Sequence, residues 1–239
     1  MIPKIIHFFW FGDNDKPAKT KKCINSWKKF CPDYQIIEWN ESNFDIDMNE
    51  YTKYTYNNKK FAFLSDYARL IVVYRYGGIY FDTDVELLKR PDELLNNKAF
   101  FGFENNDNVN TGHGFGSEAD NPMIENMLKE YHGLKKNADG SFVLTPCPKL
   151  NTEVLLKYGL RCNGQTQKLG DAVVYSADYF NPYDDAKGRL KKTKNTISIH
   201  WYAKSWIGKK EIIISKISKP FHRLFGDDCF ARFKRIKNG

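Results

Sequence analysis

One stretch of the chain constrains the fold more than any other: an apolar segment that ends at two glycines and leads directly into a second apolar segment. Residues 59–76 (KKFAFLSDYARLIVVYRY) are long and apolar enough to predict a buried helix. Gly77 and Gly78 predict its end, because glycine reaches the positive φ angles that a sharp turn requires. Residues 79–82 (IYFD) then predict a buried strand. A helix followed, after a short turn, by a buried strand is typical of an α/β protein.

The rest of the chain alternates in the same way. Residues 3–9 and 34–39 are apolar and predict strands, and residues 17–30 between them carry apolar side chains at helical spacing. The later predicted elements are strands at 99–103, 172–175 and 197–200, helices at 122–131 and 151–158, and an Asn- and Gly-rich loop at 105–117. This order predicts an α/β fold with a mostly parallel central sheet.

Composition excludes several classes of protein. A chain of 239 residues with 15% aromatic residues is not intrinsically disordered, and it is long enough for one large domain with a small appendage. It contains no apolar run of the roughly 20 residues that cross a bilayer. Its five cysteines form no CxxC pair, which argues against a zinc knuckle. We expect one domain over residues 1–206 and a basic helical extension over residues 207–239.

The positive charge is concentrated at the C-terminal end. Residues 201–239 hold ten Lys or Arg against three acidic residues, whereas the first 200 residues are nearly balanced, with 27 against 26. Apolar side chains alternate with the basic ones, which favours an anionic membrane surface as the partner of this tail. The expected location is therefore the cytoplasm, on the inner face of the cell membrane. Vesicle co-sedimentation with and without residues 209–239 would test this, and equal sedimentation would remove the claim.

Nucleic-acid binding is the alternative from a different class. The sequence pI of about 9.1 permits it, but no recognised nucleic-acid fold signature is present and the charge is confined to the tail. No nucleic-acid partner is therefore expected, and salt-dependent binding to duplex DNA would contradict that expectation.

Two carboxylates follow the strand predicted after the glycines. On an extended chain, Asp82 and Asp84 would project from the same side, roughly 6–7 Å apart. Like charges this close repel, and oxygen ligands of this kind suit a divalent cation such as Mn²⁺ or Mg²⁺. When the triplet is taken alone, a solvated Asp-Thr-Asp turn is the commoner explanation, because such triplets occur often by chance. A glycoside hydrolase would also use two carboxyl groups, but a shared strand face favours chelation over flanking a bond.

A charged pair lies one helix upstream of these carboxylates. Asp66 and Arg69 are three residues apart, so they share a helix face, which continues through the small or apolar Ala62 and Val73. An unpaired charge near a buried face is costly. The two residues therefore either pair only with each other or bind a polar ligand at the end of the sheet. The whole string, Ser65-Asp66-x-x-Arg69 followed by Gly77-Gly78-Ile79-Tyr80-x-Asp82-x-Asp84, is far more specific than the triplet.

This string resembles that of the DXD-type sugar transferases of glycosyltransferase family 32, and it is similar to the catalytic cores of large glucosylating toxins. The resemblance runs over residues 1–206, with its most specific part at 65–84. It implies a GT-A fold with one nucleotide-binding domain, a nucleotide-sugar donor, a divalent metal ion that is usually Mn²⁺, and retention of the anomeric configuration.

The resemblance also implies roles for the residues of this string. Asp84 would bind the metal ion directly, and Asp82 would contact the ribose, the metal shell or both. Asp66 would hydrogen-bond hydroxyl groups of the donor sugar, Arg69 would help hold the sugar and diphosphate, and Tyr80 would line the nucleotide site.

Three further segments resemble parts of the same family. Trp10, after the first strand, is the candidate to receive the base, although a core tryptophan is equally plausible. In the closing segment HWYAKSW, His200 would complete the metal shell, and Ser205 and Trp206 would close over the diphosphate. In the Gly-rich loop, Asn110 and His113 would face the donor sugar and the acceptor. These last two are weaker candidates, because Gly-rich loops are often only turns.

The predicted function is metal-dependent, retaining transfer of a hexose from a nucleoside diphosphate sugar to a glycan acceptor. UDP-hexose is the first expectation for the donor and GDP-mannose the second. The acceptor is expected to be a lipid-linked cell-surface polysaccharide or oligosaccharide, such as a capsule precursor. The alternative within enzymes is an effector that glycosylates a host protein. The sequence identifies no nucleophile, which favours attack on the same face as the leaving group.

Overall fold

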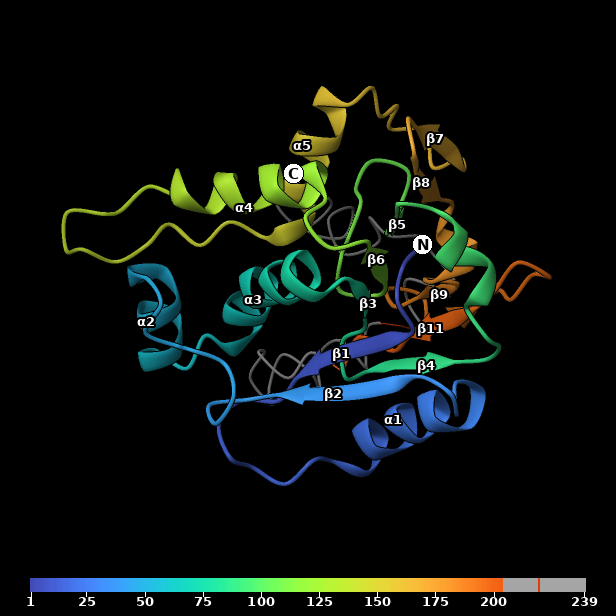
Figure 1. Ribbon diagram of the computed structural model, residues 1–239, viewed down its shortest axis with the longest axis horizontal. Helices are drawn as coiled ribbons and strands as arrows, with labels where there is room; N and C mark the ends of the chain where they lie inside the picture. The colour runs from blue at the N-terminus through green and yellow to red at the C-terminus, as the bar shows by residue number, and fades with distance from the viewer. Residues whose placement is uncertain (204–218, 220–239) are drawn as a thin grey trace, which may run out of the picture.

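A seven-stranded mixed sheet forms the centre of the molecule (Figure 1), in the strand order β2-β1-β3-β6-β5-β8-β7. The structure is a computed structural model that describes residues 1–203 and residue 219. The strands of this sheet are β1 (Ile5–Phe9), β2 (Gln35–Trp39), β3 (Gly78–Tyr80), β5 (Ala99–Gly102), β6 (Phe115–Ser117), β7 (Gln167–Leu169) and β8 (Ala172–Tyr175). Within the sheet, β6 and β7 run against the other five strands. The predicted α/β fold with a mostly parallel central sheet is thus confirmed.

Helices cover both faces of the sheet, with α1 on one side and α2 to α5 on the other (Figure 1). Their bounds are α1 (Ala18–Phe30), α2 (Glu50–Asn57), α3 (Phe61–Tyr76), α4 (Pro122–His132) and α5 (Cys147–Lys157), with short 3-10 helices η1 (Asp92–Asn96) and η2 (Ala177–Tyr179). Each side has its own cluster of buried apolar side chains. A sheet covered on both faces favours strands that are apolar on both sides, and β1 is apolar at every position except His7.

Strand β1 shows how one short segment serves both sides. Ile6 and Phe8 belong to the cluster under α1, where the ring of Phe8 meets that of Trp27 at 5.4 Å. Phe9 belongs to the cluster under α3 and packs edge-on against Phe44 at 5.2 Å. Alternate side chains of a strand point to opposite faces, so the two cores are joined through this strand.

The double glycine ends α3 as predicted. Gly77 and Gly78 have φ angles of +64° and +107°. A Cβ at Gly78 would lie 2.8 Å from the carbonyl oxygen of Ile5, so the close approach of β3 to β1 also requires glycine there. The helix begins at Phe61, two residues later than predicted.

A second, two-stranded sheet places residues 198–200 beside the segment that follows β3. Strand β4 (Val85–Leu87) pairs antiparallel with β11 (Ser198–His200), which places His200 opposite Val85. The indole of Trp27 on α1 donates a hydrogen bond of 2.8 Å to the carbonyl oxygen of Val85. A further two-stranded pair is formed by β9 (Tyr183–Asp184) and β10 (Arg189–Leu190).

The structure corrects the local setting of the acidic pair. The strand predicted at 79–82 ends at Tyr80, so Asp82 and Asp84 lie in the turn between β3 and β4 rather than on one strand face. The turn is held by a hydrogen bond of 3.0 Å from the amide of Val85 to the carbonyl oxygen of Asp82. Helix α5 begins at Cys147, four residues before the predicted start. Proline in its first turn explains this, because that position needs no amide hydrogen bond.

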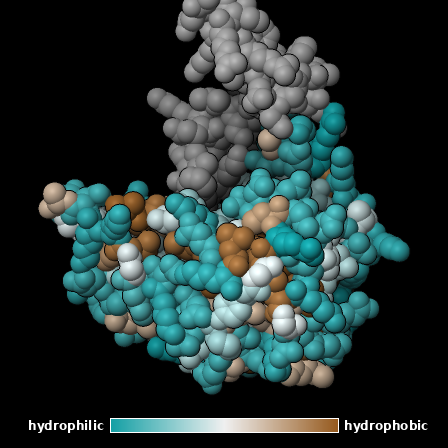
Figure 2. Space-filling model, turned by 90° about the horizontal axis from the view of Figure 1, so that it is seen from above, coloured by the Kyte–Doolittle hydropathy of each residue, from teal (hydrophilic) through white to brown (hydrophobic). Residues whose placement is uncertain are grey.

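The surface seen from above is largely hydrophilic, and its apolar side chains gather in a few small patches (Figure 2). Among the described residues, no helix has the length and apolar character needed to span a membrane. The predicted basic helical extension over 207–239, apart from residue 219, lies outside the described residues, as does the boundary predicted at 206.

Candidate active site

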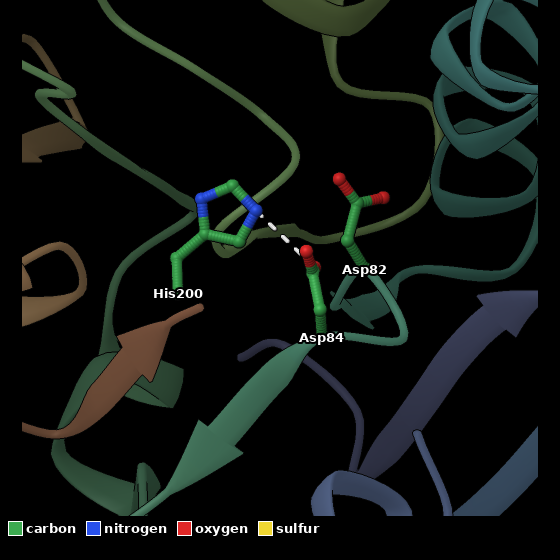
Figure 3. A group of neighbouring side chains, drawn as sticks. All are labelled: Asp82, Asp84 and His200. Atoms are coloured by element: carbon green, nitrogen blue, oxygen red, sulfur yellow. Dashed lines mark ion pairs between the residues drawn. The ribbon is translucent and has the colours of Figure 1, made fainter. Parts of the chain in front are cut away.

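Three side chains predicted to hold a metal ion come together at one edge of the sheet (Figure 3). Asp82 and Asp84 reach in from the turn after β3, and His200 reaches in from the end of β11. One ligand atom from each lies within 4.8 Å of the others, and His200 Nε2 is 3.2 Å from Asp84 Oδ1. The pairing of β4 with β11 creates this arrangement, because it brings residue 200 beside the turn.

The backbone around Asp84 fixes the position of its carboxylate. The amide of Ala203 donates a hydrogen bond of 2.7 Å to Asp84 Oδ2, and the amide of Trp201 donates one of 3.0 Å to the carbonyl oxygen of Asp84. Burial opposes charge on this carboxyl group, but the attraction of His200 and the hydrogen bonds that His200 and the amide of Ala203 donate lower the pKa of Asp84 below its ordinary value. Burial likewise opposes charge on His200, yet the contact with Asp84 raises the pKa of its imidazole. A cation bound at this point would take the place of the imidazole proton.

The second carboxylate has a different environment. Tyr80 donates a hydrogen bond of 2.9 Å to Asp82 Oδ1, and the guanidinium of Arg69 lies 3.4 Å from the same oxygen. Desolvation raises the pKa of Asp82, and Asp84 adds to that rise while Arg69 opposes it. Two neighbouring carboxylates whose pKa values move in opposite directions are typical of functional sites.

Arg69 joins helix α3 to the turn between β3 and β4 that carries Asp82 and Asp84, called the acidic turn below. Its side chain is 3% exposed, and one guanidinium nitrogen binds the carboxylate of Asp66. Its Nε donates a hydrogen bond of 3.1 Å to the carbonyl oxygen of Ser65, and its guanidinium carbon lies 5.0 Å from the centre of the Tyr80 ring. The predicted pair therefore does not stand alone, because Arg69 also contacts Asp82, and both carboxylates share one buried positive charge.

The Gly-rich loop lies against the same turn. The amide of Asp82 donates a hydrogen bond of 2.9 Å to the carbonyl oxygen of Gly112. A Cβ at Gly112 would be 2.4 Å from Asp82 Oδ2 and 2.8 Å from an Arg69 guanidinium nitrogen, so this approach requires glycine. Asn110 accepts a hydrogen bond of 2.6 Å from the amide of Gly112, which makes it a support for the loop. His113, which follows Gly112, is fully buried, and burial lowers the pKa of its imidazole well below the usual range.

The remaining predicted residues have different outcomes. Trp10 follows β1, and because β1 and β3 are parallel it lies at the same end of the sheet as the acidic turn. Its indole donates a hydrogen bond of 2.6 Å to the carbonyl oxygen of Asn14. Tyr80 is 1% exposed, so its hydroxyl group serves Asp82 and its ring belongs to the core. Ser205 and Trp206 lie outside the described residues.

Sequence reasoning assigned no role to Tyr202, which the structure places at the site. Its ring centre lies 4.2 Å from that of His200, and its hydroxyl group is 2.6 Å from Asn181 Nδ2 and 3.2 Å from Glu104. Its φ angle of +47° lies in the left-handed region, which is uncommon for a residue other than glycine. The one sequence signal that could have identified Tyr202 is its position within the closing segment HWYAKSW. No sequence signal pointed to its partners Asn181 and Glu104.

The donor set suits a hard divalent cation. Two carboxylates and an imidazole are ligands that Mn²⁺ or Mg²⁺ accepts, and three protein ligands leave further coordination positions for a substrate. The 4.8 Å span of the three ligand atoms and the pairing of Asp84 with a cationic partner both fit a bound cation. The residues present therefore fit the metal ion that the resemblance implies.

Comparison with known proteins gives one family match. Residues 17–101 match the family described as the glycosyltransferase sugar-binding region containing DXD motif, a range that includes Asp66, Arg69, Asp82 and Asp84. The chain is 34% identical over 110 residues to inositol phosphoceramide mannosyltransferase 1 of Schizosaccharomyces pombe, which covers 41% of this chain and 33% of that one. It is 30% identical over 145 residues to a mannosyl phosphorylinositol ceramide synthase of Saccharomyces cerevisiae, covering 57% and 37%.

Among solved structures, a glycosyltransferase involved in the glycosylation of the major capsid of PBCV-1 is similar, with a TM-score of 0.48 and 13% identity over 84% of this chain and 95% of that one. The chain spans about a third of the length of the curated relatives it matches.

Proposed function

We propose that this chain, whose residues 17–101 match the DXD-containing glycosyltransferase family, is a transferase that moves a hexose from a nucleoside diphosphate sugar to a hydroxyl group of a lipid-borne acceptor. The observation that carries the proposal is the convergence of Asp82, Asp84 and His200 beside Arg69. A site with two acidic ligands, one imidazole and a buried guanidinium suits a ligand that combines a metal ion with a diphosphate.

The relatives support mannose as the sugar and a lipid as the carrier. Both curated relatives are named as enzymes of mannosyl transfer to inositol-containing ceramide lipids. Mannose was the second expectation from the sequence, with UDP-hexose first. We place GDP-mannose first among donors on the strength of these relatives, and UDP-glucose and UDP-galactose after it.

Asp82, Asp84 and His200 would hold the divalent cation, which supplies positive charge to offset the diphosphate of the donor. The second guanidinium nitrogen of Arg69 is ion-paired with Asp82 but makes no hydrogen bond within the described residues, and it would donate toward the same phosphate oxygens. Asp66, with a side chain 14% exposed, accepts hydrogen bonds from donor-sugar hydroxyl groups. These side chains hold the donor so that the anomeric carbon faces the acceptor, an alignment that lowers the entropic part of the barrier.

Transfer with retention then requires the acceptor to approach the face that the diphosphate leaves. The acceptor oxygen bonds to the anomeric carbon as the bond to the phosphate oxygen breaks. The departing nucleoside diphosphate takes the bonding electrons, and the hydroxyl proton passes to its phosphate oxygen. Positive charge develops on the sugar meanwhile, and the neighbouring carboxylates stabilise it.

A panel of donors tests the proposal without knowledge of the acceptor. Binding to the folded protein raises its melting temperature in proportion to the logarithm of ligand concentration over Kd. We expect GDP-mannose with Mn²⁺ to raise the melting temperature by several degrees more than Mn²⁺ alone, and UDP-sugars to raise it less. A larger rise with a UDP-sugar would replace mannose as the donor. The absence of any rise across the panel would contradict a nucleotide-sugar site.

A further inference from the structure

Two buried histidines lie side by side behind the acidic turn. His113 precedes β6 in the Gly-rich loop, and His200 ends β11. Their ring centres are 6.0 Å apart and the rings are inclined by 48°. His113 is 0% exposed and His200 is 7% exposed, so both side chains are buried.

Both histidines leave buried nitrogens without a hydrogen bond. His113 Nδ1, His113 Nε2 and His200 Nδ1 have no partner within the part of the chain that the structure describes. Figure 3 shows the second nitrogen of His200 pointing away from Asp84 and Asp82. A buried polar atom that stays unpaired costs about 1–3 kcal/mol, so each such atom in a folded protein needs an explanation, such as a bound water molecule, an ion or a catalytic role.

Packing alone gives no reason for an imidazole at position 113. The ring of His113 stacks on Phe180 at 6.4 Å with an angle of 23°. Gly102 makes room beside it, because a Cβ there would lie 3.2 Å from His113 Cε1. A phenyl ring would use the same aromatic contacts without burying two polar nitrogens. Packing therefore does not explain why residue 113 is histidine, whereas the neighbouring His200 Nδ1, which has no hydrogen-bond partner among the described residues, does.

We propose that His113 is a positioning residue for His200: it accepts a hydrogen bond from His200 Nδ1–H through one ordered water molecule. With its proton on Nδ1, neutral His200 presents the lone pair of Nε2 to Asp84 and Asp82, where the cation would bind. Metal-binding histidines generally donate their second ring nitrogen to a carboxylate, a backbone carbonyl or a water molecule, which fixes the tautomer and the ring orientation. This inference rests on the proposed function, because it requires His200 to be a metal ligand.

Mn²⁺ binding without donor or acceptor is the first readout. Titration followed by electron paramagnetic resonance gives the Kd of the wild type and of His113→Phe, His113→Asn and His113→Gln. We expect about 10- to 100-fold weaker binding in the phenylalanine variant. One of the two amide variants should recover most of that loss, since each places its amide oxygen, a hydrogen-bond acceptor, near the position of one nitrogen of the replaced His113 ring. Unchanged binding in His113→Phe would overturn the proposal.

A double-mutant cycle separates positioning from general destabilisation. In a His200→Ala background, His113→Phe should weaken Mn²⁺ binding no further, because the residue it acts through is gone. An equal loss in both backgrounds would show that His113 acts by some other route. His132→Phe, on the exposed end of α4, is the matched control and should bind Mn²⁺ as the wild type does.

The wild type itself gives a readout that does not depend on a buried substitution. In protein labelled with ¹⁵N-histidine and saturated with Mg²⁺, the ring shifts of His200 should report a proton on Nδ1. A proton on Nε2 would overturn the proposal even if no His113 variant folds. Failure of the proposed function would look different, because the wild type and Asp84→Ala would then bind Mn²⁺ equally weakly.

Discussion

Arg69 shows how one residue can serve both the fold and the site. Its side chain is 3% exposed and contacts two carboxylates, Asp66 on its own helix and Asp82 in the acidic turn. Burying a charge is tolerable only when the charge is well paired, and removing one partner of such a pair typically costs about 3–5 kcal/mol. The guanidinium therefore holds the turn against α3 before any ligand binds. Its terminal nitrogen beside Asp82 makes an ion pair there but no hydrogen bond within the described residues, which makes that nitrogen the candidate donor to a phosphate.

Gly112 provides a prediction at the same scale. Alanine at this position would place a Cβ 2.4 Å from Asp82 Oδ2, which forces the carboxylate to move. We expect Gly112→Ala to lower kcat/KM at least about tenfold, because a displacement of this size misplaces a substrate-binding group.

The control for this substitution is Gly133→Ala. Gly133 has a negative φ angle, and the nearest atom to a Cβ there would be 3.7 Å away. Steady-state kinetics of both variants decide the matter, and equal kcat/KM values would contradict the close contact described for the loop.

The residues of the site were partly predictable from the sequence. Asp82, Asp84 and His200 could be named as a group because their resemblance to a family placed them together, and the structure brings their ligand atoms within 4.8 Å. Gly112 and Tyr202 could not be given their roles. Gly112 lies against Asp82 and Arg69, at least 30 positions earlier, and Tyr202 binds Glu104, 98 positions earlier; no local pattern encodes such contacts.

At the scale of elements, His7 connects three parts of the sheet. It lies on β1, its Nδ1 accepts a hydrogen bond of 3.0 Å from Trp39 at the end of β2, and its Nε2 lies 2.8 Å from the carbonyl oxygen of Gly77 before β3. Both contacts are satisfied by one neutral tautomer, with the proton on Nε2. Protonation of Nδ1 would point a second donor at the Trp39 indole.

Stability at acidic pH should reveal this connection. Burial, opposed by the hydrogen bond to Gly77, lowers the pKa of His7 from 6.5 to about 4. Below pH 6.5 the unfolded chain takes up a proton that the folded protein excludes, so the free energy of unfolding falls as the pH drops toward 4. The contribution reaches about 3 kcal/mol.

Chemical denaturation of the wild type and His7→Gln across this range measures the contribution. The variant should lose less stability between pH 6.5 and 4 than the wild type does. His132→Gln, at an exposed position, should follow the wild-type pH dependence. Parallel curves for all three proteins would show that His7 is not held neutral.

Local pattern predicted the main elements, and long-range pairing decided the rest. Helix α3 and strand β1 were predicted because apolar runs and a double glycine specify them within about 20 residues. The turn that holds Asp82 and Asp84 was wrongly predicted as strand. Its conformation depends on Gly112, and the position of β4 depends on β11 more than 100 residues later.

At the scale of the whole molecule, three distant segments build one site. The end of β3, the Gly-rich loop before β6 and the end of β11 meet at the carboxyl edge of β3, and α3 covers them with Arg69. In open α/β sheets, ligands bind outside the carboxyl ends of strands. The site therefore depends on the complete fold, and its chemistry is set by side chains that are far apart in the sequence.

The measurement closest to the central claim is Mn²⁺-dependent sugar transfer by Asp84→Ala compared with Asp171→Ala. Asp171 is an exposed aspartate just before β8, at the opposite edge of the sheet, where it pairs with Lys98. We predict that Asp84→Ala loses at least about 1000-fold in Mn²⁺-dependent release of nucleoside diphosphate, because a ligand of the cation is gone. The Asp171→Ala variant should keep wild-type activity. Wild-type transfer by Asp84→Ala would contradict a cation held by the acidic turn.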